Sequence, residues 1–171
     1  MSPATAQETV KELAAKASAE MRLLTSFQTL ERMTSQMNHF LIYSIQAERG
    51  GWGVLEFVET SDFTNSYVVK STAEDVQIEV ARASKSISTS KVATDDEIGQ
   101  AESAVENLDV LVALAPEIAE LLSAGDHDAA ALLYREKGQP AHINALRNLQ
   151  SGVSTTQKRL STTLLNIRVA K

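Results

Sequence analysis

The sequence predicts an all-α protein: an antiparallel up-down-up-down four-helix bundle with long first and last helices. Three observations support this fold class. Apolar residues recur at alternating spacings of three and four along four separate stretches, which is typical of helices packed in a bundle. The 171 residues include only seven Gly and three Pro, so we expect few turns and long elements. With 43% apolar residues, the single domain of residues 1–171 can bury a substantial core.

The first helix is expected over residues 4–49, which contain neither Gly nor Pro. Its apolar positions follow one side, with a small phase slip near residues 24–27. A glycine-rich connector then ends the helix. Because this connector is apolar around Trp52, we expect it to fold over the end of the bundle as a cap or lid, or to form a short strand at 54–58.

The second and third helices are expected over residues 61–88 and 95–124. Apolar residues in both follow an uninterrupted alternation of three and four. Thr94 is followed three residues later by Glu97, which is the signature of a capping box. The third helix therefore begins directly after Thr94.

The fourth helix is expected over residues 127–170. Gly125 can adopt the left-handed conformation that ends the preceding helix, and Asp126 can cap the new one. Gly138 and Pro140 should bend its upper part. Its inward stripe is mostly apolar in the lower half and polar in the upper half. The predicted stripe consists of Leu132, Arg135, Gln139, His142, Leu146, Gln150, Val153, Gln157, Leu160, Leu164 and Ile167.

The four predicted helices differ in length. At about 1.5 Å per residue, the first and fourth are roughly 65 to 70 Å long and the other two about 40 to 45 Å. Since the first helix begins and the fourth ends at the same end of an up-down bundle, both must extend together beyond the other two. We interpret this two-helix extension as part of a larger protein from which the sequence is a fragment.

The hairpin AELLSAGDHDAAALLYREKGQPAHINALRNLQ (residues 119–150) contains a Gly-Asp turn, an Ala-rich first helical turn, a proline and a Leu-x-x-Leu pair. With the projecting first and last helices, it resembles the extracytoplasmic sensor domain of bacterial methyl-accepting chemotaxis receptors and related histidine kinases. The resemblance implies a periplasmic domain joined to transmembrane segments absent from this sequence. It also implies a homodimer through helices one and four, and a small ligand bound near the membrane-distal end.

In that family, ligand binding shifts the fourth helix slightly relative to the first, and this shift signals across the membrane. Amino-acid receptors of the group cluster arginines on the distal part of the first helix. Here the first helix has only Arg22, Arg32 and Arg49, so the resemblance does not extend to that site.

A polar layer is predicted at the end of the bundle away from the termini. Extending each core stripe to this end places six polar side chains on inward faces at one level: Ser44, Glu48, Ser66, Arg135, Gln139 and His142. Arg135 could hold a carboxylate through two parallel hydrogen bonds, so a small organic acid or an aromatic carboxylate is the expected ligand. The alternative is a closed Glu48–Arg135 salt bridge with His142 as an ordinary polar neighbour.

Two further groups of side chains have alternative interpretations. Four aromatic residues lie near the polar layer, where they could line a pocket for a ring or simply cap the core: Tyr43, Trp52, Tyr67 and Tyr134. Arg32, His39 and Gln46 project outward from the first helix. They could face the first helix of a dimer partner or form a plain solvated surface.

Composition and motifs argue against several other functions. The net charge of −6 and the scattered Lys and Arg residues do not suit nucleic acid. There is no Cys, and the three His lack metal-ligand spacing. No phosphate-binding loop or nucleophile elbow occurs, so we expect no catalysis, metal or cofactor. The leading hypothesis is a ligand-sensing domain of a chemoreceptor; the alternative is a helical scaffold protein that binds a protein partner.

Overall fold

The computed structural model describes residues 3–48 and 65–170, with side chains described from residue 9 to 46 and from 73 to 170. It confirms the all-α fold class, since the described residues form helices and the turns between them. The elements are α1 (Pro3–Glu48), α2 (Asn65–Ser88), α3 (Asp95–Ser123), α4 (His127–Leu133), a π-helical segment η2 (Tyr134–Gly138) and α5 (Gln139–Val169). The last three follow one another without a break and correspond to the predicted fourth helix.

The helix bounds agree with the predicted ones to within a few residues wherever the chain is described. Residues 49 and 61–64, which the sequence also places in helices, lie outside the described residues. The connector around Trp52 lies outside them too.

The turns that separate the helices have the predicted chemistry. The Glu97 N–H donates to Thr94 Oγ1 at 3.2 Å, and the Glu97 carboxylate accepts from the Thr94 N–H at 2.8 Å. This reciprocal pair is the capping box that begins α3. At the other end of α3, Gly125 has a φ of 78°. The Asp126 carboxylate then accepts from the Ala129 N–H at 3.1 Å and begins α4.

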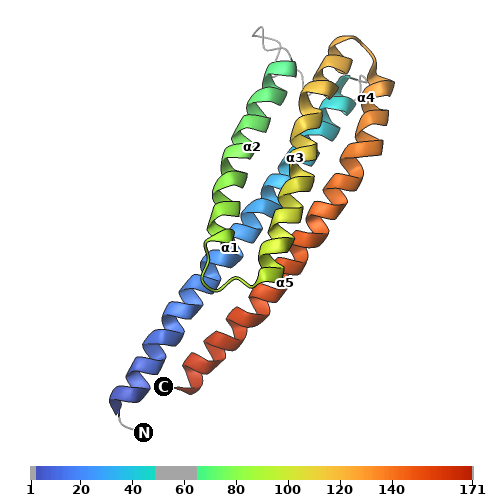
Figure 1. The fold of residues 1–171 in the computed structure, drawn as a ribbon. Helices are drawn as coiled ribbons and strands as arrows, with labels where there is room; N and C mark the ends of the chain where they lie inside the picture. Colours follow the sequence, from blue (N-terminus) through green and yellow to red (C-terminus); the bar gives the residue numbers. More distant parts are fainter. Residues whose placement is uncertain (1–2, 49–64, 171) are drawn as a thin grey trace.

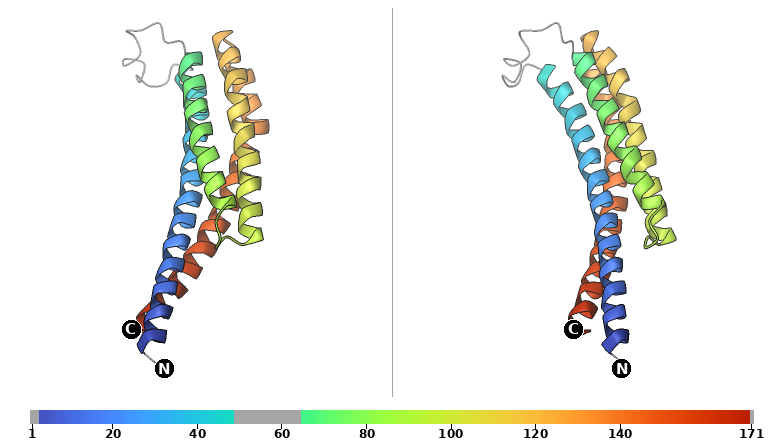
Figure 2. Two further views of the ribbon diagram at one scale, coloured as in Figure 1. Left: turned by 60° about the vertical axis from the view of Figure 1, so that its left-hand side comes forward. Right: turned by 90° about the vertical axis from the view of Figure 1, so that its left-hand side faces the viewer.

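Helices α1 and α5 lie side by side and reach the end of the molecule where both termini lie (Figure 1). Helices α2 and α3 pack on the part of this pair that is farther from the termini. The short turn between α2 and α3 lies partway along the molecule, and α1 and α5 continue together beyond it (Figure 2). We call this extension, residues 3–19 of α1 and 160–169 of α5, the stalk. Its existence agrees with the paired extension expected from the helix lengths.

One hydrophobic core unites α1, α2, α3 and α5. A smaller cluster of Ala17, Leu24 and Leu160 joins α1 to α5 at the start of the stalk. The largest apolar side chains with almost no exposure are Leu23, Phe27, Leu30, Met37, Leu41, Ile87, Leu108, Leu111, Ile118 and Leu149.

The inward face of α5 is not the predicted stripe. Six predicted positions in this last helical stretch are exposed: Leu132, Arg135, Gln139, Gln150, Gln157 and Leu164. The buried positions are Ala141, Ala145, Leu149, Gly152, Thr156, Leu160 and Thr163. Most of these residues are small, and periodicity analysis gives small residues little weight.

Gly152 shows why the helix presents this face. A Cβ atom at Gly152 would overlap the ring of Phe27. The backbone of α5 therefore lies directly against that ring, which only glycine permits. Packing against Phe27 turns the small-residue face inward and leaves the glutamines outside.

Candidate functional site

The predicted polar layer does not form in the described part of the chain. Arg135 and Gln139 are exposed, so the expectation that they face inward is wrong. The buried residues of this stretch are Ala130, Gly138 and Ala141. Because small residues take the inward positions, the long polar side chains remain in solvent.

The π-helical turn η2 contributes to this difference. The Gln139 N–H donates to the carbonyl of Tyr134, five residues earlier. The wide turn relieves the clash that the ring of Pro140 would cause in a regular α-helix. An extra residue in one turn shifts the helix phase by about 100°, since an α-helix has 3.6 residues per turn. The predicted stripe was extended through η2 with a constant helical period. Beyond η2 it therefore lies on a different face of the helix.

The two other described members of the layer, Ser44 and His142, have different surroundings. Ser44 is buried and donates to the carbonyl of Phe40 in its own helix at 2.9 Å. His142 is half-buried, and this burial lowers its pKa. The side chains of Glu48, Trp52, Ser66 and Tyr67 lie outside those described. The Glu48–Arg135 salt bridge therefore stays a prediction.

The aromatic residues near this end have different surroundings. The Tyr134 hydroxyl donates a hydrogen bond to Asn38 Oδ1 and so joins η2 to α1. Burial raises the pKa of Tyr134, and the bond to Asn38 partly offsets that effect. Tyr43 is exposed and stacks on His39, with 5.9 Å between ring centroids. Tyr134 therefore packs between helices, whereas Tyr43 lies on the surface.

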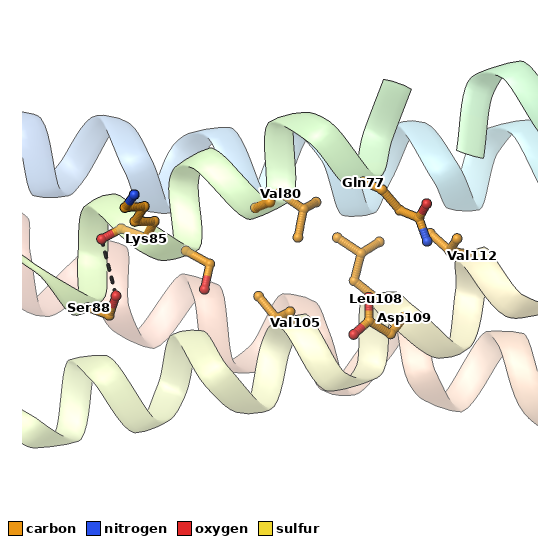
Figure 3. Close-up of a pocket in the computed structure, with 10 residues that line it drawn as sticks. Gln77, Val80, Lys85, Ser88, Val105, Leu108, Asp109 and Val112 are labelled. Carbon is orange, nitrogen blue, oxygen red and sulfur yellow. Dashed lines mark hydrogen bonds between the residues drawn. The ribbon is translucent and has the colours of Figure 1, made fainter. Parts of the chain in front are cut away.

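A groove of about 480 Å³ lies between α2 and α3 (Figure 3). Its buried apolar residues are Val80, Leu108 and Val112. Figure 3 shows Lys85 and Ser88 at one end and Gln77 and Asp109 toward the other. A groove with an apolar floor and polar ends can accept a small amphipathic molecule.

Asp109 is the acidic residue of this groove. Asp109 is exposed as a residue, but partial burial of its carboxyl group raises the pKa of that group. Among the described residues, no side chain or backbone group forms a hydrogen bond or ion pair with it. Helix α3 carries eight Asp and Glu residues and no Lys, Arg or His. The negative charge of α3 favours a cation near Asp109, whereas Lys85 of α2 supplies a positive charge at the other end of the groove.

A cluster of charged side chains lies at the start of the stalk. We call Glu20, Glu97, Thr156 and Arg159 the junction cluster. Glu20 and Glu97 are 0% and 1% exposed, and the Arg159 side chain is 22% exposed. Arg159 Nη1 donates to Glu97 Oε2 at 2.9 Å, and Arg159 Nε lies 3.2 Å from Glu20 Oε1. One guanidinium from α5 thus lies between a carboxylate of α1 and a carboxylate of α3.

Glu97 is well satisfied within this cluster. Its carboxylate accepts from the Thr156 hydroxyl at 2.7 Å, the Thr94 hydroxyl at 3.1 Å, and Arg159. Burial by itself would raise the pKa of Glu97, but the hydrogen bonds from Arg159, the Thr94 N–H and Thr156, together with the positive charge of Arg159, outweigh it and lower the pKa. Glu97 therefore serves both as the capping residue of α3 and as the anion that holds Arg159.

Sequence reasoning identified Glu97 as a capping residue but missed its two charged neighbours. A signal was present, because Glu20 lies between Ala17 and Leu24 at the spacing of the apolar stripe of α1. An acidic residue at such a position predicts a buried partner. The partner was hidden because the predicted face of α5 ran through Gln157 and Leu160 instead of Thr156.

Among the side chains that the structure describes, those of residues 9–46 and 73–170, no cluster of His, Asp and Glu could hold a metal ion. No helix within residues 3–48 and 65–170 combines the length and apolar character needed to cross a membrane. Comparison of the chain with protein-family models, curated proteins and solved structures finds no significant match. Any proposal for its function must therefore rest on its own residues.

Proposed function

We propose that this chain is the extracytoplasmic ligand-sensing domain of a transmembrane chemoreceptor, with the up-down-up-down topology expected from its sequence. The paired extension of α1 and α5 carries the proposal (Figure 1). Two helices that leave a bundle together can transmit a relative shift to whatever they join. In this proposal they join transmembrane segments, and the four-helix part lies on the periplasmic side of the bacterial inner membrane.

The signal in this proposal is a small shift of α5 relative to α1. A ligand that binds one arrangement of the two helices more tightly than another changes their populations. The domain acts as a homodimer through α1 and α5. Arg32, His39 and Gln46 are all exposed on α1, which leaves this face open to a partner helix.

Two regions are candidates for the ligand. The groove between α2 and α3 suits a small molecule with an ammonium group and an aliphatic body, because Asp109 lies there without a partner in the described chain. The exposed face around Arg135, Gln139 and His142 suits the small organic acid expected from the sequence. Each region has one charged residue whose substitution tests it.

A thermal-shift screen of the 171-residue chain tests both regions. A ligand at 100 times its dissociation constant stabilises the fold by about 2.7 kcal/mol, which corresponds to a rise of roughly 5 to 10 °C in Tm for a domain of this size. The library contains alkylamines, amino acids, organic acids and aromatic carboxylates. Asp109→Asn should abolish a rise caused by an amine, and Arg135→Ala one caused by an acid.

Each substitution is the control for the other, since both residues are exposed and lie on different helices. The screen is repeated at high protein concentration, so that a site completed by dimerisation is included. If no compound raises Tm under either condition, direct small-molecule sensing is rejected.

A helical scaffold protein is the second candidate. It is favoured by the apolar side chains on the stalk: Leu164, Leu165 and Val169 are 49%, 60% and 86% exposed. Such residues commonly mark a surface that another protein covers. If Leu165→Ser with Val169→Ser abolishes an oligomer seen by light scattering while no ligand raises Tm, the scaffold function gains support.

A further inference from the structure

Only some of the nitrogens in the Arg159 guanidinium donate hydrogen bonds to described groups. Nη1 donates to Glu97 at 2.9 Å. Nε and Nη2 form no hydrogen bond with any described group. These two nitrogens lie on one edge of the planar guanidinium, which is the edge that can bind a carboxylate through two parallel hydrogen bonds.

Glu20 faces this edge from α1 with matching free acceptors. Its carboxylate is fully buried, and neither oxygen accepts a hydrogen bond from a described group. Oε1 lies 3.2 Å from Arg159 Nε, which is within ion-pair distance, but the alignment is not that of a hydrogen bond. Two free donors and two free acceptors are thus adjacent in a buried site. Leaving them unpaired is costly, and aligning them removes that cost.

We propose that Glu20 and Arg159 form a two-position latch between α1 and α5. In the open position, which the structure shows, the two groups share only the 3.2 Å contact. In the closed position, Glu20 accepts from both Nε and Nη2. A helix displacement of about 1 to 2 Å, as occurs at packed helix interfaces, is of the size needed for this exchange.

The moving partner is α1. Glu97 is anchored to Thr94 at the beginning of α3, and both Thr156 and Arg159 of α5 bind it. Arg159 is therefore fixed relative to α3, whereas, among the described residues, Glu20 is connected to the cluster only through Arg159. Beyond the latch, α1 packs on α5 through Ala17 and Leu160. Closing the latch therefore displaces the stalk helices relative to each other.

Nuclear magnetic resonance of the ¹⁵N-labelled 171-residue chain tests the latch without any ligand. The Nε–Hε signal of Arg159 is the one that Arg159→Lys removes. We expect exchange between two environments, seen as two signals or as relaxation dispersion on the microsecond-to-millisecond scale. The backbone amides of Ala17 and Leu160 should show the same exchange rate. A single Arg159 signal without exchange means one position and overturns the proposal.

Glu20→Gln provides the second arm. It preserves shape but removes the charge and one acceptor, so the exchange should disappear and the Arg159 Hε signal should move upfield. The matched control is Glu12→Gln, the same substitution at an exposed position of α1. Exchange that persists in Glu20→Gln overturns the latch. The role of the latch in signalling rests on the proposed sensor function, but the existence of the latch does not. A negative ligand screen therefore leaves the outcome of the resonance experiment unaffected.

Discussion

The junction cluster and the distal end differ in where they place their charged side chains. At the junction, two carboxylates and one guanidinium are buried together. At the distal end, Arg135 and Gln139 are exposed although both lie on the predicted inward stripe. The difference lies in the neighbouring residues. Carboxylates from both α1 and α3 face Arg159 at one level. Around Arg135 in η2, the buried positions are the small residues Ala130, Gly138 and Ala141. Burial of a charge depends on partners from adjacent helices more than on its place in the periodic pattern.

The largest expected effect comes from removing the arginine of the junction cluster. Arg159→Met leaves Glu20 and Glu97 buried without their cation, which should lower the free energy of unfolding by about 3 to 5 kcal/mol. Arg135→Met is the matched control at the distal end, and it should change stability by less than about 0.5 kcal/mol. Urea unfolding followed by circular dichroism measures both. If the two substitutions lowered the free energy of unfolding equally, the contrast between the junction cluster and the distal end would be wrong.

The next effect tests the packing that decides which face of α5 is buried. Gly152→Ala places a methyl group against the Phe27 ring and should destabilise by about 1 to 3 kcal/mol. The control is Gly99→Ala in α3, where a Cβ atom would meet no other atom within 4 Å. That substitution should stabilise by about 0.5 to 1 kcal/mol, because alanine favours helix. A stabilising Gly152→Ala would contradict the close packing of α5 on Phe27.

The same contrast shows what the sequence could predict. Helix positions, the Thr94–Glu97 capping box and the Gly125–Asp126 turn depend on local chemistry, and the structure confirms them. The orientation of α5 depends on Phe27, a residue of another helix more than 100 positions away. Local periodicity contains no information about such a contact. The predicted polar layer was wrong for this reason and because η2 shifts the phase of the helix. Glu20 was overlooked because the wrong orientation of α5 hid its partner Arg159.

A smaller effect is expected at the hydrogen bond that joins α1 to the π-helical turn. Tyr134→Phe removes the hydroxyl that donates to Asn38 and should cost about 1 kcal/mol. Tyr43→Phe is the control, since the Tyr43 ring is exposed and stacks on His39 within its own helix. We expect no measurable change there. If Tyr134→Phe also leaves Tm unchanged, this bond does not hold α1 against η2.

The smallest expected effects are losses of folding stability in two separate pH ranges. The pKa of Glu97 lies below its ordinary value of 4.5, so its contribution to stability is complete above pH 4.5 and is lost as pH falls through the lowered pKa. His142 has a pKa below 6.5 because burial disfavours its cation. The unfolded chain therefore takes up a proton first, and stability begins to fall below pH 6.5. Thermal unfolding of Glu97→Gln and His142→Gln between pH 3 and 8 separates the two, since each substitution should flatten only its own window. The loss of stability due to His142, at the distal end, should be smaller than the loss due to Glu97. The reason is that His142 is only half-buried and makes no charged pair among the described residues.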